Sequence, residues 1–377
     1  MNLIYLDHNA SSPVAPEAVA AMQPWLAHCG NPTSTHAWGR QAAMAIEEAR
    51  SEVAALLGCA AEELFFTSGG TESDNLAILG LCDPARPAHL ICSAIEHPAV
   101  LNTVGFLESR GWSVSRVGVD GQGVLKLAEL EAALRADTRL VSVMLANNEV
   151  GSLQPVHEIS RLVRARGIPL HSDAAQAVGK HRVKVDELGV DLLTVAGHKL
   201  NAPIGVGALY VRKGIQLQPL CHGASHERGL RPGTPNVLEI VGLGAAARRF
   251  EMAESGILEE YAGLRDHFER VLRETLPAVR FNAGRAPRLG NTSSVSFPGI
   301  RSGDLMAACP RVAASAGAAC HRDHTEPSHV LAAMGLPLET IESTLRFSVG
   351  LGTTREQLNQ AITLLAQALR ELGFSSR

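Results

Sequence analysis

Short apolar runs alternate with helical periods along the first two thirds of the chain. Seven of these runs are predicted to be strands, at residues 63–67, 89–92, 114–117, 140–145, 168–171, 192–195 and 206–211. Amphipathic stretches lie between them, such as residues 41–57, which place Ile46, Val53 and Leu57 on one face and end at Gly58. This alternation is typical of an α/β fold, in which helices cover both faces of a largely parallel sheet.

The pattern changes after about Ser255. A long helical stretch there is followed by short strands predicted at 293–297 and 345–349 and by a terminal helix at 354–372. With 377 residues the chain is too long for one ordinary core. We therefore predict a large domain over residues 14–256 and a small α+β domain built from residues 1–13 and 257–377.

Composition and charge argue against several classes of protein. The net charge is −4 and the Lys and Arg residues are dispersed, so nothing indicates binding to nucleic acid or to an anionic membrane. No apolar run approaches the roughly 20 residues of a transmembrane helix, and the first residues lack the features of a signal peptide. We expect a cytoplasmic protein. The seven cysteines are scattered and form no C-x-x-C pair, which argues against a disulfide framework.

Polar groups follow several of the predicted strands. Residues 66–72 form a Gly-rich strand-to-helix turn, whose backbone amides suit a phosphate. His97 follows the second strand and is able to stack on a flat ring or to move protons. Asn148 follows the fourth and offers a neutral hydrogen-bond donor. Taken singly, each of these segments is better explained as an ordinary turn.

Asp173 and Lys199 provide the most informative pair, because each comes directly after a short apolar run. In a mostly parallel sheet, ligands bind at the carboxyl ends of the strands. A carboxylate that faces a pyridinium nitrogen, with a lysine able to form an imine, is the pair that pyridoxal 5'-phosphate (PLP) requires. With Gln176 and the groups named above, these residues form one polar rim. The sequence therefore predicts a PLP site at this edge of the sheet.

The motifs resemble those of the class V aminotransferases, which are fold type I PLP enzymes, and among them the cysteine desulfurase and selenocysteine lyase family. The resemblance covers nearly the whole chain, from residues 5–10 and 30–34 to residues 345–350. It implies a fold type I architecture with a mostly parallel seven-stranded sheet in the large domain. The active unit is then expected to be a homodimer.

The resemblance also implies a role for each residue of the rim. Lys199 would bind PLP covalently and later move the Cα proton of the substrate, and Asp173 would keep the pyridine nitrogen protonated. His97 would stack on the ring. The remaining contacts are expected from Gln176 and Asn148 to the phenolic oxygen, and from Gly70, Thr71, His198 and the neighbouring subunit's copy of Thr234 to the phosphate.

The type of reaction depends on Cys320, which follows a run of small residues at 314–319. Neighbouring imidazoles favour the thiolate form of such a cysteine. The resemblance implies that Cys320 takes the sulfur of L-cysteine, leaving L-alanine and a persulfide for a sulfur acceptor such as an iron-sulfur scaffold. Arg346, together with Asn148, would bind the α-carboxylate of the substrate.

Three alternatives remain open from the sequence. A selenocysteine lyase is the first, because residues 197–199 and 319–324 are similar to those enzymes and Ala196 stands where many desulfurases have a serine. A non-catalytic PLP-fold protein that serves as a sulfur-carrier platform is the second. The third is a zinc site at residues 320–324, where Cys, His and Asp are competent ligands. We expect no metal, because small residues before Cys320 do not suit a rigid site.

Overall fold

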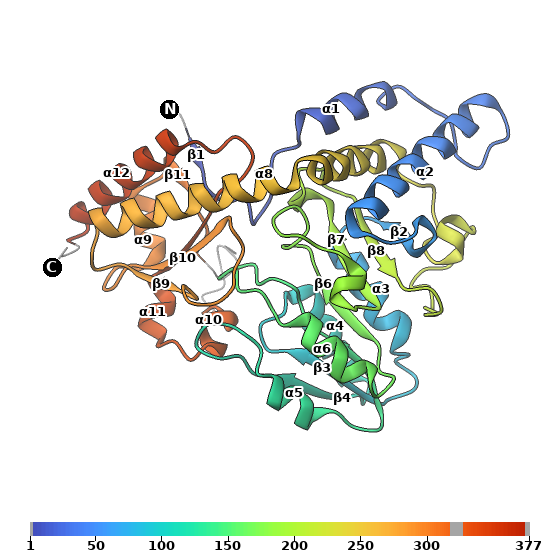
Figure 1. Ribbon diagram of the computed structural model, residues 1–377, viewed down its shortest axis with the longest axis horizontal. Coiled ribbons are helices and arrows are strands. Elements are labelled where there is room, and N and C mark those ends of the chain that lie inside the picture. Colours follow the sequence, from blue (N-terminus) through green and yellow to red (C-terminus); the bar gives the residue numbers. More distant parts are fainter. Residues whose placement is uncertain (1–2, 317–326, 374–377) are drawn as a thin grey trace.

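A seven-stranded sheet dominates the computed structural model, which describes residues 3–316 and 327–373 (Figure 1). The strand order is β2-β8-β7-β6-β5-β3-β4, and within the described residues β8 runs opposite to the other six strands. The strands are β2 (Leu64–Thr67), β3 (His89–Ser93), β4 (Ser113–Val117), β5 (Thr138–Ser142), β6 (Leu170–Asp173), β7 (Leu192–Ala196) and β8 (Gly207–Val211). All seven predicted strands are present, with ends that differ by a few residues, so the predicted mostly parallel sheet is confirmed.

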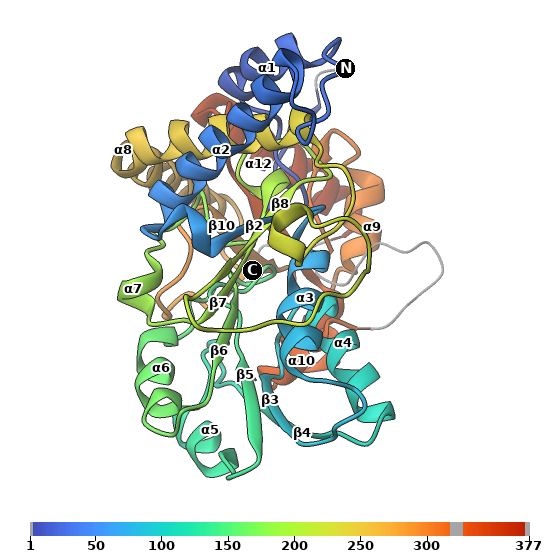
Figure 2. The same ribbon diagram turned by 90° about the vertical axis from the view of Figure 1, so that its right-hand side faces the viewer.

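Helices cover both faces of this sheet (Figure 2). Helices α3 (Gly70–Leu81) and α4 (Pro98–Ser109) lie on one face, and α5 (Leu127–Ala133), α6 (Val156–Arg164) and α7 (Val185–Leu188) lie on the other. Side chains of the central strands, such as Ile91, Val141 and Leu193, are fully buried. Burial of each such side chain stabilises the fold by about 1.5–3 kcal/mol, which explains why the strands read as continuous apolar runs.

The long helix α8 (Val237–Thr275) packs against α1 (Pro16–Met22) and α2 (Ala37–Leu57) (Figure 1). The sequence predicts its start near Ser255, but the Asn236 side chain caps it earlier, accepting a hydrogen bond from the Glu239 amide at 3.4 Å. Gly244 makes the close approach to α2 possible, since a Cβ there would lie 2.6 Å from Cα of Ala49. The predicted boundary at residue 256 therefore falls inside a helix, three residues after non-helical dihedrals at Ala253 (φ −125°, ψ 16°). The domain limits stay a prediction.

Helix α2 also begins earlier than predicted, since the periodicity places its start at residue 41. The His36 side chain accepts a hydrogen bond from the Gly39 amide at 3.2 Å and so caps the helix at Ala37. Its predicted end is confirmed, because Gly58 adopts the left-handed conformation (φ 69°).

The second part of the molecule contains a three-stranded antiparallel sheet in the order β12-β10-β9. Its aromatic core joins Phe268 of α8 to Phe347, with ring centroids 5.1 Å apart. The predicted strands at 293–297 and 345–349 and the terminal helix are confirmed, each shifted by about one residue. The remaining elements are β1 (Ile4–Tyr5), β9 (Arg280–Asn282), β10 (Thr292–Ser296), β11 (Val312–Ala313), β12 (Thr344–Ser348), α9 (Ser302–Ala308), α10 (His329–Ala333), α11 (Leu338–Glu342), α12 (Arg355–Glu371) and the short 3₁₀ turns η1 (Gln23–Trp25), η2 (Ala61–Glu63), η3 (Gly197–Lys199) and η4 (His226–Gly229).

None of the helices in the described residues has the length and apolar character needed to cross a membrane.

Candidate active site

A cavity of about 750 Å³ lies at the carboxyl ends of the parallel strands, where the β1 segment and the three-stranded sheet meet the seven-stranded sheet. Its wall brings together nine residues that the sequence predicts for the site. These are Gly70, Thr71, His97, Asn148, Asp173, Gln176, His198, Lys199 and Arg346. The convergence follows from topology, because parallel strands present the residues after them to a single edge.

Lys199 ends the 3₁₀ turn η3 directly after β7. Its Nζ donates hydrogen bonds to the carbonyl oxygens of Asn9 and Ala10, the second at 2.7 Å. Burial, reinforced by the positive charge of Arg346, lowers the pKa of Lys199 to about 8. Far more of this amine than of a free lysine is therefore unprotonated near neutral pH, which is the form that attacks an aldehyde carbon.

Asp173 is the last residue of β6 and is 6% exposed. Its Oδ1 accepts a hydrogen bond from the Ala175 amide at 2.8 Å. Burial raises the pKa of this carboxyl, which lies in the same cavity wall as Lys199. No arginine or lysine forms an ion pair with Asp173 in the described residues, and the charges of His97 and Lys199 only partly offset the effect of burial on its pKa. A protonated pyridine nitrogen is the kind of group that such a carboxylate suits, and the residues present therefore fit PLP.

The turn between β2 and α3 forms the end of the cavity where a phosphate is expected. Gly69 has φ 151°, which an L side chain rarely adopts, and Gly70 and Thr71 begin α3. Gly207 of β8 permits this turn, because a Cβ there would lie 2.7 Å from Cα of Gly69. The first amides of a 12-residue helix suit a phosphate.

His198 and Ala196 line the cavity with this turn. Burial, with the charge of Lys199, lowers the pKa of His198 to about 4, so the imidazole is neutral at pH 7. Its Nδ1 lies 3.4 Å from Oγ of Ser11. A Cβ built on Gly70 would be 3.3 Å from the Ala196 methyl, so position 196 offers this turn a methyl group and no hydroxyl.

His97 lies at the N-terminus of α4 and is accessible from the cavity. Its Nδ1 accepts a hydrogen bond from the Ala99 amide at 3.1 Å, which leaves the ring proton on Nε2. Partial burial lowers the pKa of this imidazole and favours the neutral ring. Stacking of His97 on the cofactor ring stays a prediction.

Arg346 enters the cavity wall from β12. Its Nη2 lies 2.7 Å from Oδ1 of Asp7, and its Nη1 donates to the carbonyl oxygen of Asn148 at 2.8 Å. Nε has no hydrogen-bond partner in the described residues. Since a guanidinium carries five N–H donors, donors remain for a carboxylate. Its predicted role in substrate binding stays a prediction.

Asn9 is a residue that sequence reasoning missed. Its backbone oxygen accepts hydrogen bonds from Lys199 and Gln176, while its Nδ2 donates to Oγ1 of Thr292 at 2.8 Å. It thereby joins the segment after β1, the three-stranded sheet and the cavity wall. Only its place in the motif at residues 5–10 signalled its importance.

Glu96 was also missed as an individual residue, and it lies behind His97 with no exposure. Its Oε1 accepts hydrogen bonds from the Ser93 hydroxyl at 2.6 Å and from the Met144 amide at 2.8 Å. Its Oε2 has no partner in the part of the chain that is described. Burial raises the pKa of Glu96 to about 8, so the carboxyl is largely neutral at pH 7.

Glu96→Gln is expected to make the stability of the protein less sensitive to a rise in pH from about 4.5 to about 8. The glutamate ionises at about 4.5 in the unfolded chain and at about 8 in the fold, so its presence favours unfolding increasingly as pH rises between these values. Each pKa unit corresponds to about 1.4 kcal/mol of unfolding free energy. Urea unfolding of both proteins at the two ends of this range measures the effect. Equal pH dependence in the two proteins would contradict it.

Among the described residues, Thr234 is the one predicted site residue that does not line the cavity. Thr234 is exposed on the segment before α8. Cys320 lies outside the described residues, as does the rest of the segment 320–324 considered for zinc. In residues 3–316 and 327–373, no group of three or more His, Cys, Asp or Glu side chains is arranged to hold a metal ion.

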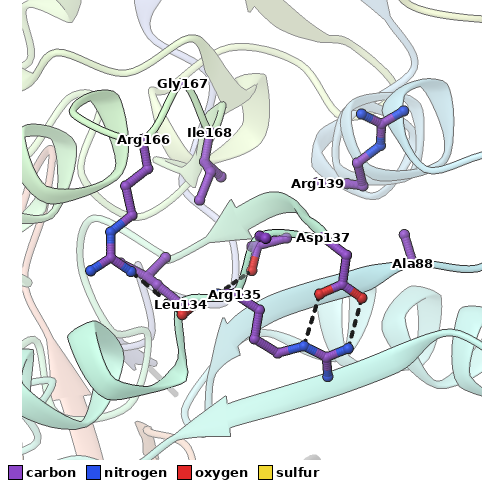
Figure 3. A pocket seen from close by; sticks show the side chains of 10 residues that line it. Ala88, Leu134, Arg135, Asp137, Arg139, Arg166, Gly167 and Ile168 are labelled. Carbon is purple, nitrogen blue, oxygen red and sulfur yellow. Dashed lines mark hydrogen bonds and ion pairs between the residues drawn. The ribbon is translucent and has the colours of Figure 1, made fainter.

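A second hollow of about 660 Å³ lies at the opposite edge of the sheet, beside the amino ends of β5 and β6 (Figure 3). Arg135 there pairs with Asp137 at 2.7 Å, and Arg166 donates to the carbonyl oxygen of Leu134 at 3.4 Å. Asp137 offsets part of the positive charge that the arginines bring to the lining of this hollow. It holds none of the nine residues predicted for the cofactor site.

Comparison with known proteins agrees with this geometry. Residues 4–360 match the family model Aminotransferase class-V. A protein named cysteine desulfurase from Trichormus azollae is 43% identical over 377 residues, covering 99% of this chain and 94% of the relative. Among solved structures, a NifS-like protein superposes with a TM-score of 0.91 at 35% identity and covers 98% of this chain and 100% of its own. SspA in complex with cysteine superposes with a TM-score of 0.82 at 36% identity, with 92% and 98% covered. The chain therefore belongs to the aminotransferase class V family, as its motifs predict.

Proposed function

We propose that this protein is a PLP-dependent cysteine desulfurase, which converts L-cysteine to L-alanine and leaves a persulfide on Cys320. The observation that carries the proposal is the convergence of Asp173, Lys199 and Arg346 on one cavity. The names of the relatives support the choice of reaction, since the Trichormus protein is called a cysteine desulfurase and SspA was solved with cysteine.

Five residues are expected to hold the cofactor in this cavity. Lys199 Nζ would bind it covalently, Asp173 would pair with its pyridine nitrogen, and the phosphate would lie at Gly70 and Thr71 beside neutral His198. When bound, PLP supplies an electron sink that lets bonds at the substrate Cα break. The protein contributes binding, orientation and proton transfer around that sink.

Arg346 would bind the α-carboxylate of L-cysteine, with Asp7 and the Asn148 carbonyl holding the guanidinium in place. Lys199 Nζ would take the proton from Cα, for which its pKa of about 8 is well matched. The Cys320 thiolate would then attack the substrate sulfur, forming an S–S bond while the C–S bond breaks and its electron pair stays with carbon. Protonation of that carbon gives alanine, and the persulfide on Cys320 awaits a sulfur acceptor such as an iron-sulfur scaffold.

The proposal is tested by incubating the purified protein with PLP, L-cysteine and a thiol reductant. Alanine and sulfide are expected in equal amounts. Pyruvate and ammonia in place of alanine would contradict the proposal, because they arise by elimination of the sulfur. Comparison of kcat/KM for cysteine and selenocysteine decides between the desulfurase and a selenocysteine lyase.

We also propose that the active unit is a homodimer in which Thr234 binds the phosphate of the neighbouring subunit. Thr234 is exposed and lies away from its own cavity wall. Large apolar side chains are exposed as well, including Leu26 (72%), Met44 (72%) and Ile204 (71%). A homodimer that buries these side chains would remove their apolar surface from water.

Thr234→Val is expected to raise the Kd for PLP about tenfold, since one hydrogen bond to a charged group is lost.

Coexpression of Thr234→Val chains with Lys199→Ala chains tests the shared site more sharply. A mixed dimer with one change on each chain retains one site in which both residues are native, so about half of the wild-type activity is expected. Both changes on one chain, paired with a wild-type chain, leave no such site. Equal activity of the two arrangements would contradict a shared site.

A further inference from the structure

Lys180 is a buried lysine that the proposed reaction does not use. It lies in the turn after β6, it is 4% exposed, and its Nζ donates a hydrogen bond to Oε1 of Gln176 at 2.7 Å. In the described residues no carboxylate forms an ion pair with it. Burial, with the charges of Lys199 and Arg346, holds its pKa well below that of a free lysine. An amine that is buried beside an active site without a carboxylate partner, and that donates to a residue of the cavity wall, points to a role beyond packing.

The hydrogen bond from Lys180 helps to define the orientation of the Gln176 side chain. A primary amide has one acceptor end and one donor end, and their positions are set by the partners of each. Oε1 of Gln176 accepts from Lys180, while Nε2 donates to the carbonyl oxygen of Asn9 at 2.9 Å. Lys199 Nζ donates to the same carbonyl oxygen. Gln176 is 6% exposed and lines the cavity, so a reversed amide would leave a lysine without its acceptor.

We propose that Lys180 is a positioning residue, which acts on the cofactor through Gln176. By holding Oε1 of Gln176, it directs Nε2 of that amide to the Asn9 side of the cavity, where Nε2 is available to the phenolic oxygen of PLP. This inference rests on the proposed function and on the contact of Gln176 with that oxygen, which the resemblance implies. A donor at the phenolic oxygen stabilises its negative charge. Without Lys180 only the hydrogen bond to the Asn9 carbonyl oxygen holds the amide, and a reversed amide would present its carbonyl oxygen, which repels that charge.

The inference is tested on the absorbance of the bound cofactor, which changes with pH as the covalently bound chromophore loses a proton. Since the deprotonated chromophore carries more negative charge, loss of the donor is expected to raise the pH midpoint of this change. Lys180→Met keeps the length of the side chain and removes the donor. We expect an upward shift of about one pH unit. Lys180→Gln retains a donor and is expected to keep a midpoint close to that of the wild type.

Two further variants separate this role from packing and from direct charge effects. Lys184→Met is the matched control and is expected to leave the midpoint unchanged. In the described residues Lys184 Nζ donates only to the carbonyl oxygens of Ala55 and Leu56, which lie outside the cavity wall. In a Gln176→Leu background, Lys180→Met is expected to add no further shift. A full shift in that background would overturn the inference, because Lys180 would then act without Gln176.

Other outcomes are equally decisive. An unchanged midpoint in Lys180→Met, measured on protein that binds the chromophore, would overturn the positioning role and leave the proposed function intact. Absence of the chromophore from the wild type would overturn both. If Lys180→Met does not fold, Gln176→Leu alone must raise the midpoint, and an unchanged value there would overturn the inference.

Discussion

Lys199→Ala is expected to lose both the covalently bound cofactor and the activity. The Lys199 amine is the group that the cavity presents next to Asp173, and burial lowers its pKa to about 8. Its removal takes away the attachment point and the base for the Cα proton together. A positioned acid or base alone contributes about 10²–10⁴-fold to a rate, so activity should fall by at least this factor. The absorbance spectrum after dialysis and the rate of alanine formation measure the two losses.

Lys213→Ala is the matched control for this experiment. Lys213 is exposed, follows β8 and does not line the cavity, so its removal should change neither the spectrum nor the rate. Borohydride reduction followed by peptide mapping identifies the attached residue in the wild type. Cofactor found on another lysine, Lys180 included, would overturn the assignment of Lys199.

Cys320→Ala is expected to keep the cofactor and to lose sulfide release from cysteine. The residues that would hold PLP lie in the cavity wall and do not include Cys320, so the spectrum should remain that of the wild type. Without the thiolate, however, the substrate sulfur has no acceptor, and alanine formation should fall to background. Spectra and alanine assays on one preparation separate the two effects.

Cys221→Ala and Cys29→Ala serve as matched controls, because both cysteines are exposed and free. Neither change should alter the rate. Sulfide release by Cys320→Ala at the wild-type rate would exclude Cys320 as the sulfur acceptor. If that variant released selenide from selenocysteine while failing with cysteine, the thiol would serve sulfur only, and the selenocysteine lyase would become the better description.

The polar rim of the cavity was predictable because its members follow strands directly in sequence. A strand that ends at Asp173 and one that ends just before the turn of Lys199 place both groups at the same edge once the strands are parallel. The seven strands were recognisable for a related reason. Strands β3, β6, β7 and β8 are buried at every position, which favours apolar residues on both of their faces, whereas β4 at the edge of the sheet is partly exposed.

The contacts that orient these groups were not predictable from local patterns. Asp7 and Arg346 are 339 residues apart, and Asn9 is 283 residues from Thr292, so no spacing along the chain reveals either contact. Lys180 shows the same limit at short range. It follows a glycine and reads as an ordinary surface lysine, yet it is buried because the turn after β6 folds beneath the cavity.

The start of α8 illustrates a different limit. Its first half contains glycines and alanines, with a weak apolar stripe. These small residues serve a close contact with α2, where Gly244 meets Ala49. Because that contact depends on a second helix, the periodicity of α8 alone places its start too late.

The most direct test of the proposed reaction is a single turnover with L-cysteine in the absence of reductant, followed by mass spectrometry of the peptide that contains Cys320. One alanine should form per subunit, and that peptide should be heavier by one sulfur atom, which a reductant then releases as sulfide. Alanine formed without added sulfur on Cys320, or sulfur found on another cysteine, would contradict the account.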